Sequence, residues 1–137
     1  MATPAPIDLK LVYEFVSVAH TDFKRVQEML LQEPNLVNAT WDWGEGDWET
    51  ALGAAAHMGR ADIANFLLQN GSRLDIFAAA MLGKFEIVMA AVKDNPEIIN
   101  ILGPHGIPLI DHAKAGGEAS ADVANFLEKQ VESNSRL

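Results

Sequence analysis

The apolar residues of this chain recur at spacings of three and four positions, which place them on one face of a helix. Two such stripes follow each other in the middle of the chain: Leu52, Ala55 and Ala56, then Ile63, Phe66 and Leu67. Gly59 separates them and suits a helix end, because glycine tolerates the left-handed conformation of a helix cap. No segment keeps the alternation of apolar and polar residues that marks a half-buried strand. The pattern therefore predicts short helices joined by turns.

One part of the chain returns as a near-copy, and a second part returns as a more distant copy. Residues 61–67 return as 121–127 with six of seven residues identical, and residues 15–38 align with 77–100 at an offset of 62. Repetition at a fixed distance is the signature of repeat architectures. We therefore predict four units of two short helices each, eight helices in all.

The four predicted units form a single domain over residues 7–132. They cover approximately residues 7–38, 48–71, 75–100 and 107–132, and the tails 1–6 and 133–137 are expected to be flexible. In the first unit, two stripes are expected to face inward: Leu9, Val12, Val16 and Ala19, then Phe23, Val26, Leu30 and Leu31.

The segment Thr50–Gly59, followed by residues 63–71, resembles an ankyrin repeat. That family has a 33-residue period and a T-P-L-H-x-A opening. Residues 107–113 are a second, weaker copy of the opening. The resemblance implies an all-α, ankyrin-like solenoid in which the opening threonine fixes the start of a helix. It also implies a protein–protein interaction module, an adaptor or inhibitor, that binds through concave inner helices and finger loops.

The chain departs from the family pattern in ways that predict its shape. Gly53 and Ile110 stand where the opening motif has a histidine. The helix-ending positions are Thr21, Gly59, Gly83 and Gly116. Successive positions are 38, 24 and 33 residues apart, whereas the family period is 33 residues. These steps predict a long finger before the second unit, a truncated middle junction at residues 72–75 and a finger of normal length at residues 100–107.

The long finger, residues 38–49, holds all three tryptophans and four carboxylates but no basic residue. Its candidate binding residues are Trp41, Asp42, Trp43, Trp48 and Glu49. Exposed tryptophans anchor partners and attract cations, so the finger suits a cationic ligand or a stacked sugar. Alternatively, the tryptophans fold down as core and cover the truncated junction. Trp41 and Trp43 share one face if the segment is extended.

Three histidines complete the candidate binding set. His105, in the second finger, is placed to face the tryptophan finger across the gap, or else is a solvated turn residue. His57 and His112 lie near the ends of inner helices, where they either line the concave face or bond a neighbouring turn. His20 precedes a helix break and is expected at the surface. The alternative to a protein partner is a small ligand, held between residues 41–48 and the 101–107 loop.

Composition excludes several function classes. The net charge of −9 and the scattered basic residues argue against nucleic acid. No apolar run approaches the ~20 residues of a membrane span, and the start of the chain lacks a secretion signal. Together with the absence of cysteine, this favours the cytoplasm.

The residue spacing also argues against catalysis. The chain has no H-E-x-x-H pair, nucleophile elbow or phosphate loop. An acid–base or metal pocket could in principle combine Glu45, Asp47 and Glu49 with His105 and Asp111. Only the expected proximity of their loops supports such a pocket. We therefore expect no enzymatic activity, catalytic residue, metal or cofactor.

Overall fold

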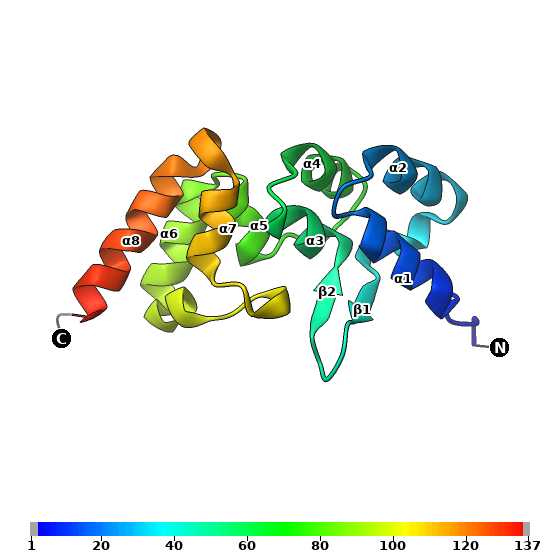
Figure 1. Cartoon of the computed structure of the whole chain (residues 1–137), viewed down its shortest axis with the longest axis horizontal. Helices are drawn as coiled ribbons and strands as arrows, with labels where there is room; N and C mark the ends of the chain where they lie inside the picture. The colour runs from blue at the N-terminus through cyan, green and yellow to red at the C-terminus, as the bar shows by residue number, and fades with distance from the viewer. Residues whose placement is uncertain (1–2, 136–137) are drawn as a thin grey trace.

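The fold is a row of helix pairs, seen side by side in Figure 1. The computed structural model describes residues 3–135, and eight α-helices lie in this part of the chain, as predicted. The first helices of the pairs are α1 (Leu9–Val18), α3 (Ala51–His57), α5 (Ile76–Met81) and α7 (Leu109–Ala115). Their partners are α2 (Phe23–Gln32), α4 (Ala61–Gln69), α6 (Phe85–Asp94) and α8 (Ala121–Ser135). The first helices contact one another in succession and form the inner row.

Short 3-10 helices continue the repeat. They are η1 (Pro34–Asn38), η2 (Pro96–Asn100), η3 (Pro104–Gly106) and η4 (Gly117–Ser120). The pair η1 and η2 follows α2 and α6 at equivalent positions, which agrees with the sequence copies there. None of the helices in the described part is both long and apolar enough to cross a bilayer.

Side-chain caps explain where several helices begin. Thr50 accepts a hydrogen bond from the backbone N–H of Gly53 at 3.0 Å and caps α3, as the ankyrin resemblance implies. Asp75 caps α5 in the same way, through the backbone N–H of Ala78 at 2.8 Å. Each cap satisfies one of the amides that a helix start leaves without a partner.

The core combines large apolar side chains, such as Phe15, Leu52 and Leu109, with small residues on the inner helices. Ala54, Ala55 and Ala56 of α3 are fully buried, as are the matching alanines 78–80 of α5. Small side chains let the inner helices pack closely. Gly83 has φ +72°, and a Cβ atom there would collide with the backbone of Ala119 in the last pair.

The first pair is less buried than the sequence stripes predict. Leu9 and Leu31 are 69% and 85% exposed, so these two core assignments are wrong. For Leu9 the physical reason is that an end pair has a neighbour on one side only. Leu31 lies at the end of α2 beside an open hollow that it lines with Phe66 and Asn70, so the neighbouring pair does not cover it.

The long finger is a β-hairpin, so the prediction that the chain contains only helices is wrong here. Strands β1 (Thr40–Asp42) and β2 (Trp48–Thr50) pair antiparallel, with Trp41 opposite Glu49. Each strand has three residues, too few for an alternating pattern to be visible in the sequence. The hairpin projects away from the helices (Figure 1) and adds no sheet to the core.

The middle junction between α4 and α5 consists of residues 70–75. The side chain of Asn38 binds it from the first unit: its amide donates to the carbonyl of Gly71 and its oxygen accepts from the N–H of Arg73. At the C-terminal end α8 reaches Ser135, beyond the expected boundary at residue 132. The flexibility expected of residues 1–2 and 136–137 lies outside the described residues.

Candidate functional site

A cluster of three histidines surrounds one buried carboxylate between the two fingers. Glu49 comes from β2 and is 1% exposed. His20 follows α1, His57 is the last residue of α3, and His105 lies in η3 of the second finger. Four segments that are distant in the sequence therefore meet at one point.

The imidazoles all turn the same nitrogen, Nε2, towards the carboxylate. His20 Nε2 lies 3.2 Å from Oε1 of Glu49. His57 and His105 approach Oε2, with Nε2 at 3.0 Å and 3.3 Å respectively. The indole Nε1–H of Trp43 donates to Oε1 at 3.0 Å. Ligand atoms of the three histidines and Glu49 all lie within 4.8 Å of one another.

Two of the histidines are oriented by partners on their other nitrogen. His20 Nδ1 lies 3.0 Å from the carbonyl oxygens of both Val16 and Ser17. His105 Nδ1 lies 2.8 Å from Oδ2 of Asp47, and its backbone N–H donates to Oδ1 at 2.7 Å. Carbonyl and carboxylate oxygens only accept hydrogen bonds, so Nδ1 carries the proton in both rings. This leaves Nε2 of each ring facing the centre of the cluster.

The local electrostatics favour an ionised Glu49. Burial raises the pKa of Glu49, but the close imidazoles of His20 and His57 and their charge outweigh burial and bring the pKa to about 2. In return, the hydrogen bond to Glu49 raises the pKa of His20 against the opposing effect of burial. Glu49 is therefore a carboxylate at neutral pH although water scarcely reaches it.

The hydrogen bonding of the cluster is incomplete. Glu49 Oε2 and His57 Nε2 are buried, and neither atom has a partner with hydrogen-bond geometry, although they lie 3.0 Å apart. Buried polar atoms without such a partner are uncommon and costly. The centre of the cluster is thus a polar point that the protein's own hydrogen bonds do not satisfy.

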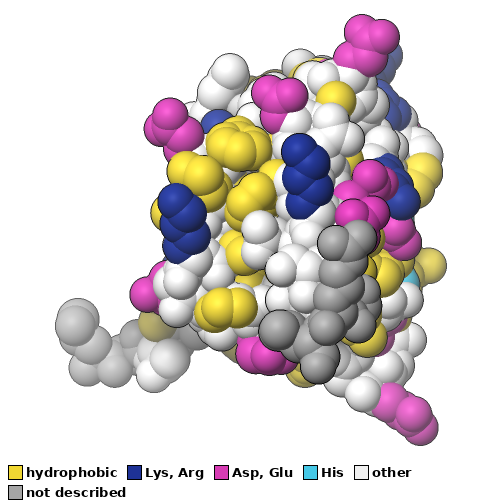
Figure 2. Space-filling model, turned by 90° about the vertical axis from the view of Figure 1, so that its left-hand side faces the viewer, with side chains coloured by type: hydrophobic (Ala, Val, Ile, Leu, Met, Phe, Trp, Pro, Cys, Tyr) yellow, Lys and Arg dark blue, Asp and Glu magenta, His cyan; other side chains and the backbone are white. Residues whose placement is uncertain are grey.

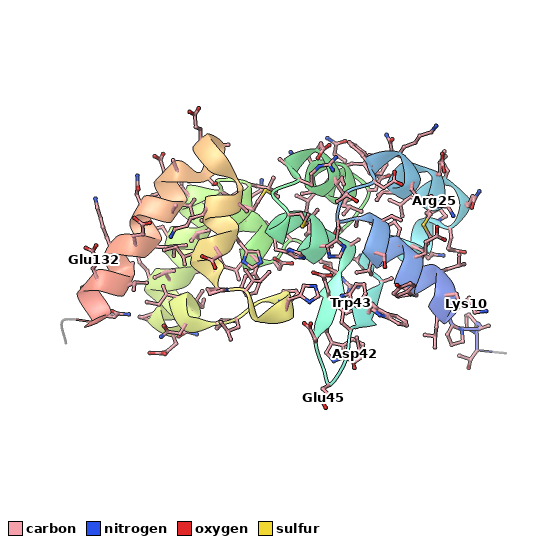
Figure 3. The ribbon with its side chains drawn as sticks, viewed as in Figure 1. Lys10, Arg25, Asp42, Trp43, Glu45 and Glu132 are labelled. Atoms are coloured by element: carbon pink, nitrogen blue, oxygen red, sulfur yellow. The ribbon has the colours of Figure 1, made fainter. Side chains whose placement is uncertain are left out.

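The structure separates the three tryptophans into two environments. Trp41 and Trp43 share a face of the hairpin, as predicted, and pack edge-on against Tyr13 of α1, with ring centroids 5.4 and 5.7 Å apart. Both are partly buried, which favours the packing alternative for this pair. Asp42 accepts hydrogen bonds from the backbone of the hairpin turn. Figure 3 shows Trp43 and Asp42 in the hairpin, with Glu45 at its tip.

Trp48 is 59% exposed, so it is not a core residue. It lines two shallow hollows, of about 280 and 300 Å³, together with Phe77 and Pro104. Leu102, 61% exposed, borders the first of them. These four residues, which we call the finger surface, lie between the hairpin and the 101–107 loop, where the small-ligand alternative expects a pocket.

The structure decides between the alternatives for His112 and corrects the assignment of His20. His112 does not line the concave face but bonds the turn before α7: it is fully buried, its Nδ1 lies 2.9 Å from the carbonyl of Pro108, and its ring packs on Phe77. Burial lowers its pKa. His20 is not a surface residue, because its side chain is 20% exposed and belongs to the cluster. One signal was available in the sequence: His20 and His57 each lie within two residues of a helix-ending position.

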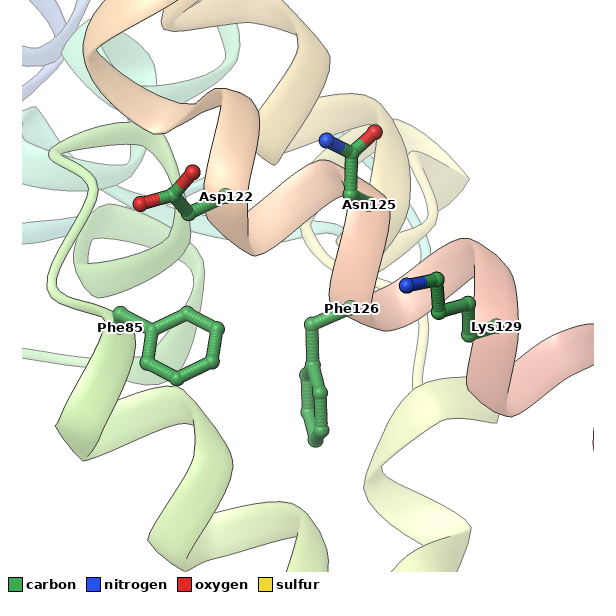
Figure 4. Close-up of a pocket in the computed structure, with 5 residues that line it drawn as sticks. All are labelled: Phe85, Asp122, Asn125, Phe126 and Lys129. Atoms are coloured by element: carbon green, nitrogen blue, oxygen red, sulfur yellow. The ribbon is translucent and has the colours of Figure 1, made fainter.

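A further pocket lies far along the row, between α6 and α8 (Figure 4). It has a volume of about 380 Å³ and is lined by Phe85 and Phe126, with Asp122, Asn125 and Lys129 on α8. Figure 2 shows the adjacent end of the molecule, where hydrophobic side chains lie among scattered lysines, arginines and carboxylates. None of the histidines lines this pocket, and its charged residues are one aspartate and one lysine.

Comparison with known proteins supports the family resemblance over one part of the chain. A comparison with curated proteins gave no match. The family model of the ankyrin repeat matches residues 47–79. This stretch begins in the hairpin and includes α3, α4 and the start of α5. The chain therefore carries an ankyrin repeat, which spans residues 47–79.

Proposed function

We propose that the chain is a protein interaction module, an ankyrin-like solenoid of four helix pairs that acts as an adaptor or inhibitor. Ankyrin repeats generally mediate protein–protein interaction. The partner docks on the finger surface and on the adjoining inner helices. The chain itself carries out no catalysis in this proposal.

The observation that carries the proposal is the exposed apolar finger surface. Trp48 presents more than half of its side chain to water, next to Phe77, Leu102 and Pro104. Tryptophan is enriched among the few residues that supply most of the binding energy of an interface. The two hollows beside Trp48 are of a size to accept an apolar side chain from a partner.

Contacts between the fingers hold this surface in place before binding. Asp47 of the hairpin binds both the backbone N–H and the ring of His105 in the other finger. Gly53 permits the approach, because a Cβ there would already lie 3.5 Å from Cγ of Pro104, and a longer side chain would meet the loop. A surface that is ordered beforehand loses less conformational entropy on binding.

The charge of the long finger indicates the chemistry of the partner. Residues 38–49 contain four carboxylates and no basic residue, and the whole chain has a net charge of −9. Glu45 at the hairpin tip is exposed. Electrostatic complementarity therefore favours a partner segment that places an apolar side chain beside Trp48 and flanks it with Lys or Arg.

The small-ligand alternative depends on the same hollows. Ligand pockets usually enclose about 300–1,000 Å³. One hollow, of about 280 Å³, falls below this range, and the other, of about 300 Å³, lies at its lower limit. Trp48 is the one tryptophan that lines them, since Trp41 and Trp43 pack on Tyr13. The shallow form fits a protruding side chain better than an enclosed cation or sugar.

A selection of displayed random peptides tests the proposal. We expect enriched peptides to carry an apolar residue flanked by Lys or Arg. By calorimetry, Trp48→Ala should weaken binding of a selected peptide at least ~30-fold, the effect of losing a hot spot of about 2 kcal/mol. Leu31→Ala is the matched control, because Leu31 is a large exposed residue on α2 and does not line the hollows beside Trp48.

Equal affinity of the Trp48 and Leu31 variants for the selected peptides would contradict the proposal. A selection that enriches no peptide would also contradict it. A thermal shift with small cations or sugars that depends on Trp48, without peptide enrichment, would favour the alternative instead.

A further inference from the structure

We propose that His20, Glu49, His57 and His105 form a binding site for one divalent transition-metal ion of the zinc class. The site goes beyond the docking function proposed above and does not depend on it. All four ligands come from the protein, which is the arrangement of a structural zinc site, whereas catalytic sites keep one position open for water.

The donor set has the chemistry that such an ion prefers. Zinc binds imidazole nitrogen at about 2.0–2.1 Å and carboxylate oxygen at about 2.0–2.2 Å, almost always with four ligands at the corners of a tetrahedron. These bond lengths separate neighbouring ligand atoms by roughly 3.3 Å. Nε2 of His57 and of His105 already lie near this spacing from Oε2 of Glu49, at 3.0 and 3.3 Å. Nε2 of His20 lies 3.2 Å from the other carboxylate oxygen, Oε1.

The remaining distances require only small movements. All the ligand atoms lie within 4.8 Å of one another, so pairs of imidazoles must close by at most about 1.5 Å to reach tetrahedral spacing. His105 can move most easily, because it lies in a loop and is partly exposed. This exposed edge also gives an ion a route to the otherwise buried Glu49.

Groups outside the ligand set strengthen the inference. Histidines that bind metals almost always donate their other ring N–H to a carboxylate or a backbone carbonyl, which fixes the tautomer. His105 does so to Asp47, and His20 does so to the carbonyls that end α1. In both rings Nε2 faces Glu49. It is the nitrogen that carries the lone pair for a metal in the neutral ring, so binding of the ion displaces any proton held between Nε2 and the carboxylate.

Among the described residues, four buried side-chain atoms lack a hydrogen-bond partner, and two of the four lie at the centre of the same cluster. They are Glu49 Oε2 and His57 Nε2, one from each kind of ligand. A metal ion placed between them would satisfy both at once. This observation is independent of the spacing of the ligands and points to the same occupant.

The position of the site indicates its role. A bound ion would link the end of α1, the hairpin, the end of α3 and the second finger. Metal binding would therefore stabilise the folded chain by mass action and fix the spacing of the two fingers.

Metal-free protein titrated with Zn²⁺ near neutral pH tests the proposal. We expect one-to-one binding by calorimetry and a rise in Tm. Titration with Co²⁺ should give visible absorption bands with the intensity of a four-coordinate ion, which a loosely bound surface ion does not show.

Three variants separate this site from unspecific binding. Glu49→Gln should abolish one-to-one binding. His105→Asn removes a ligand while suiting the left-handed backbone at this position, φ 62°, so it should weaken binding without unfolding the chain. Asp47→Asn should cost 10- to 100-fold in affinity, the usual effect of losing a partner behind a ligand.

The matched controls are Glu45→Gln, which removes an exposed carboxylate of the same hairpin, and His112→Gln, which removes the histidine outside the cluster. Both should bind Zn²⁺ as the parent chain does, with folding checked by circular dichroism. Absence of one-to-one binding, or equal affinity of His105→Asn and Glu45→Gln, would overturn the proposal.

Discussion

Replacement of Glu49 by glutamine tests how the metal-free cluster contributes to stability. Glutamine keeps the size of the side chain and removes its charge, so it resembles the protonated carboxylic acid. Because Glu49 is 1% exposed, water cannot compensate for the lost interactions with the histidines. We expect Glu49→Gln to fold and to be less stable at neutral pH.

The magnitude follows from the pKa of Glu49, which folding lowers from 4.5 to about 2. One pKa unit corresponds to about 1.4 kcal/mol of preference for the ionised form. The ionised carboxylate is thus favoured by about 3 kcal/mol in the folded state. Glutamine forfeits this preference, so the variant should lose about 3 kcal/mol of unfolding free energy, a large share of typical domain stability.

The pH dependence has a definite sign. A carboxyl whose pKa is lowered on folding contributes stability above its unfolded value of 4.5 and loses that contribution as the pH falls towards 2. His20, whose pKa is raised, contributes fully below 6.5 and loses its contribution as the pH rises through its folded pKa. The difference between the parent chain and the variant should therefore be largest between pH 4.5 and 6.5.

Urea unfolding with a chelator present, followed by circular dichroism at several pH values, measures this difference. Glu45→Gln serves as the control for loss of an exposed charge from the same hairpin and should change stability by less than ~0.5 kcal/mol. A loss below ~1 kcal/mol for Glu49→Gln between pH 4.5 and 6.5 would refute the electrostatic reasoning. A loss that stays constant down to pH 2 would assign the effect to packing instead.

Two further predictions concern the packing of the helix pairs. Leu52→Ala should cost ~2–5 kcal/mol, because Leu52 is fully buried and its truncation leaves a cavity; a cost below ~1 kcal/mol in denaturant melts would contradict its role between pairs. Gly83→Ala should lower Tm, because the left-handed backbone at φ +72° alone costs alanine ~1–2 kcal/mol and the new Cβ meets the backbone of Ala119. Gly71→Ala, at φ +99° with open space around it, isolates the backbone component, and an equal loss in both variants would argue against the collision.

The helices could be predicted from the sequence because their signals are local. The apolar spacing around Leu52 and Ile63 marks two helices, Gly59 ends the first, and Thr50 caps it within three residues. The copies at long distance show that the same unit recurs. The hairpin was missed because three-residue strands carry almost no pattern, and the exposure of Leu9 was missed because an end position has the same local sequence as an internal one.

The candidate binding residues were likewise predicted from the sequence only in part. The sequence singled out Trp48, Glu49, His57 and His105 as unusual residues of fingers and helix ends, but it indicated neither their partners nor the inclusion of His20. Their burial also depends on the neighbouring units, as the buried His112 shows.

The sequence by itself determined the succession of eight helices and the short junction between α4 and α5, since each depends on residues a few positions apart. Only the tertiary structure decided that the hairpin and the second finger meet, and that Glu49 lies among three imidazoles from three other segments. The physical reason is that stacking of rigid helix pairs sets the positions of the loops between them, and no local pattern records which loop ends that stacking brings into contact.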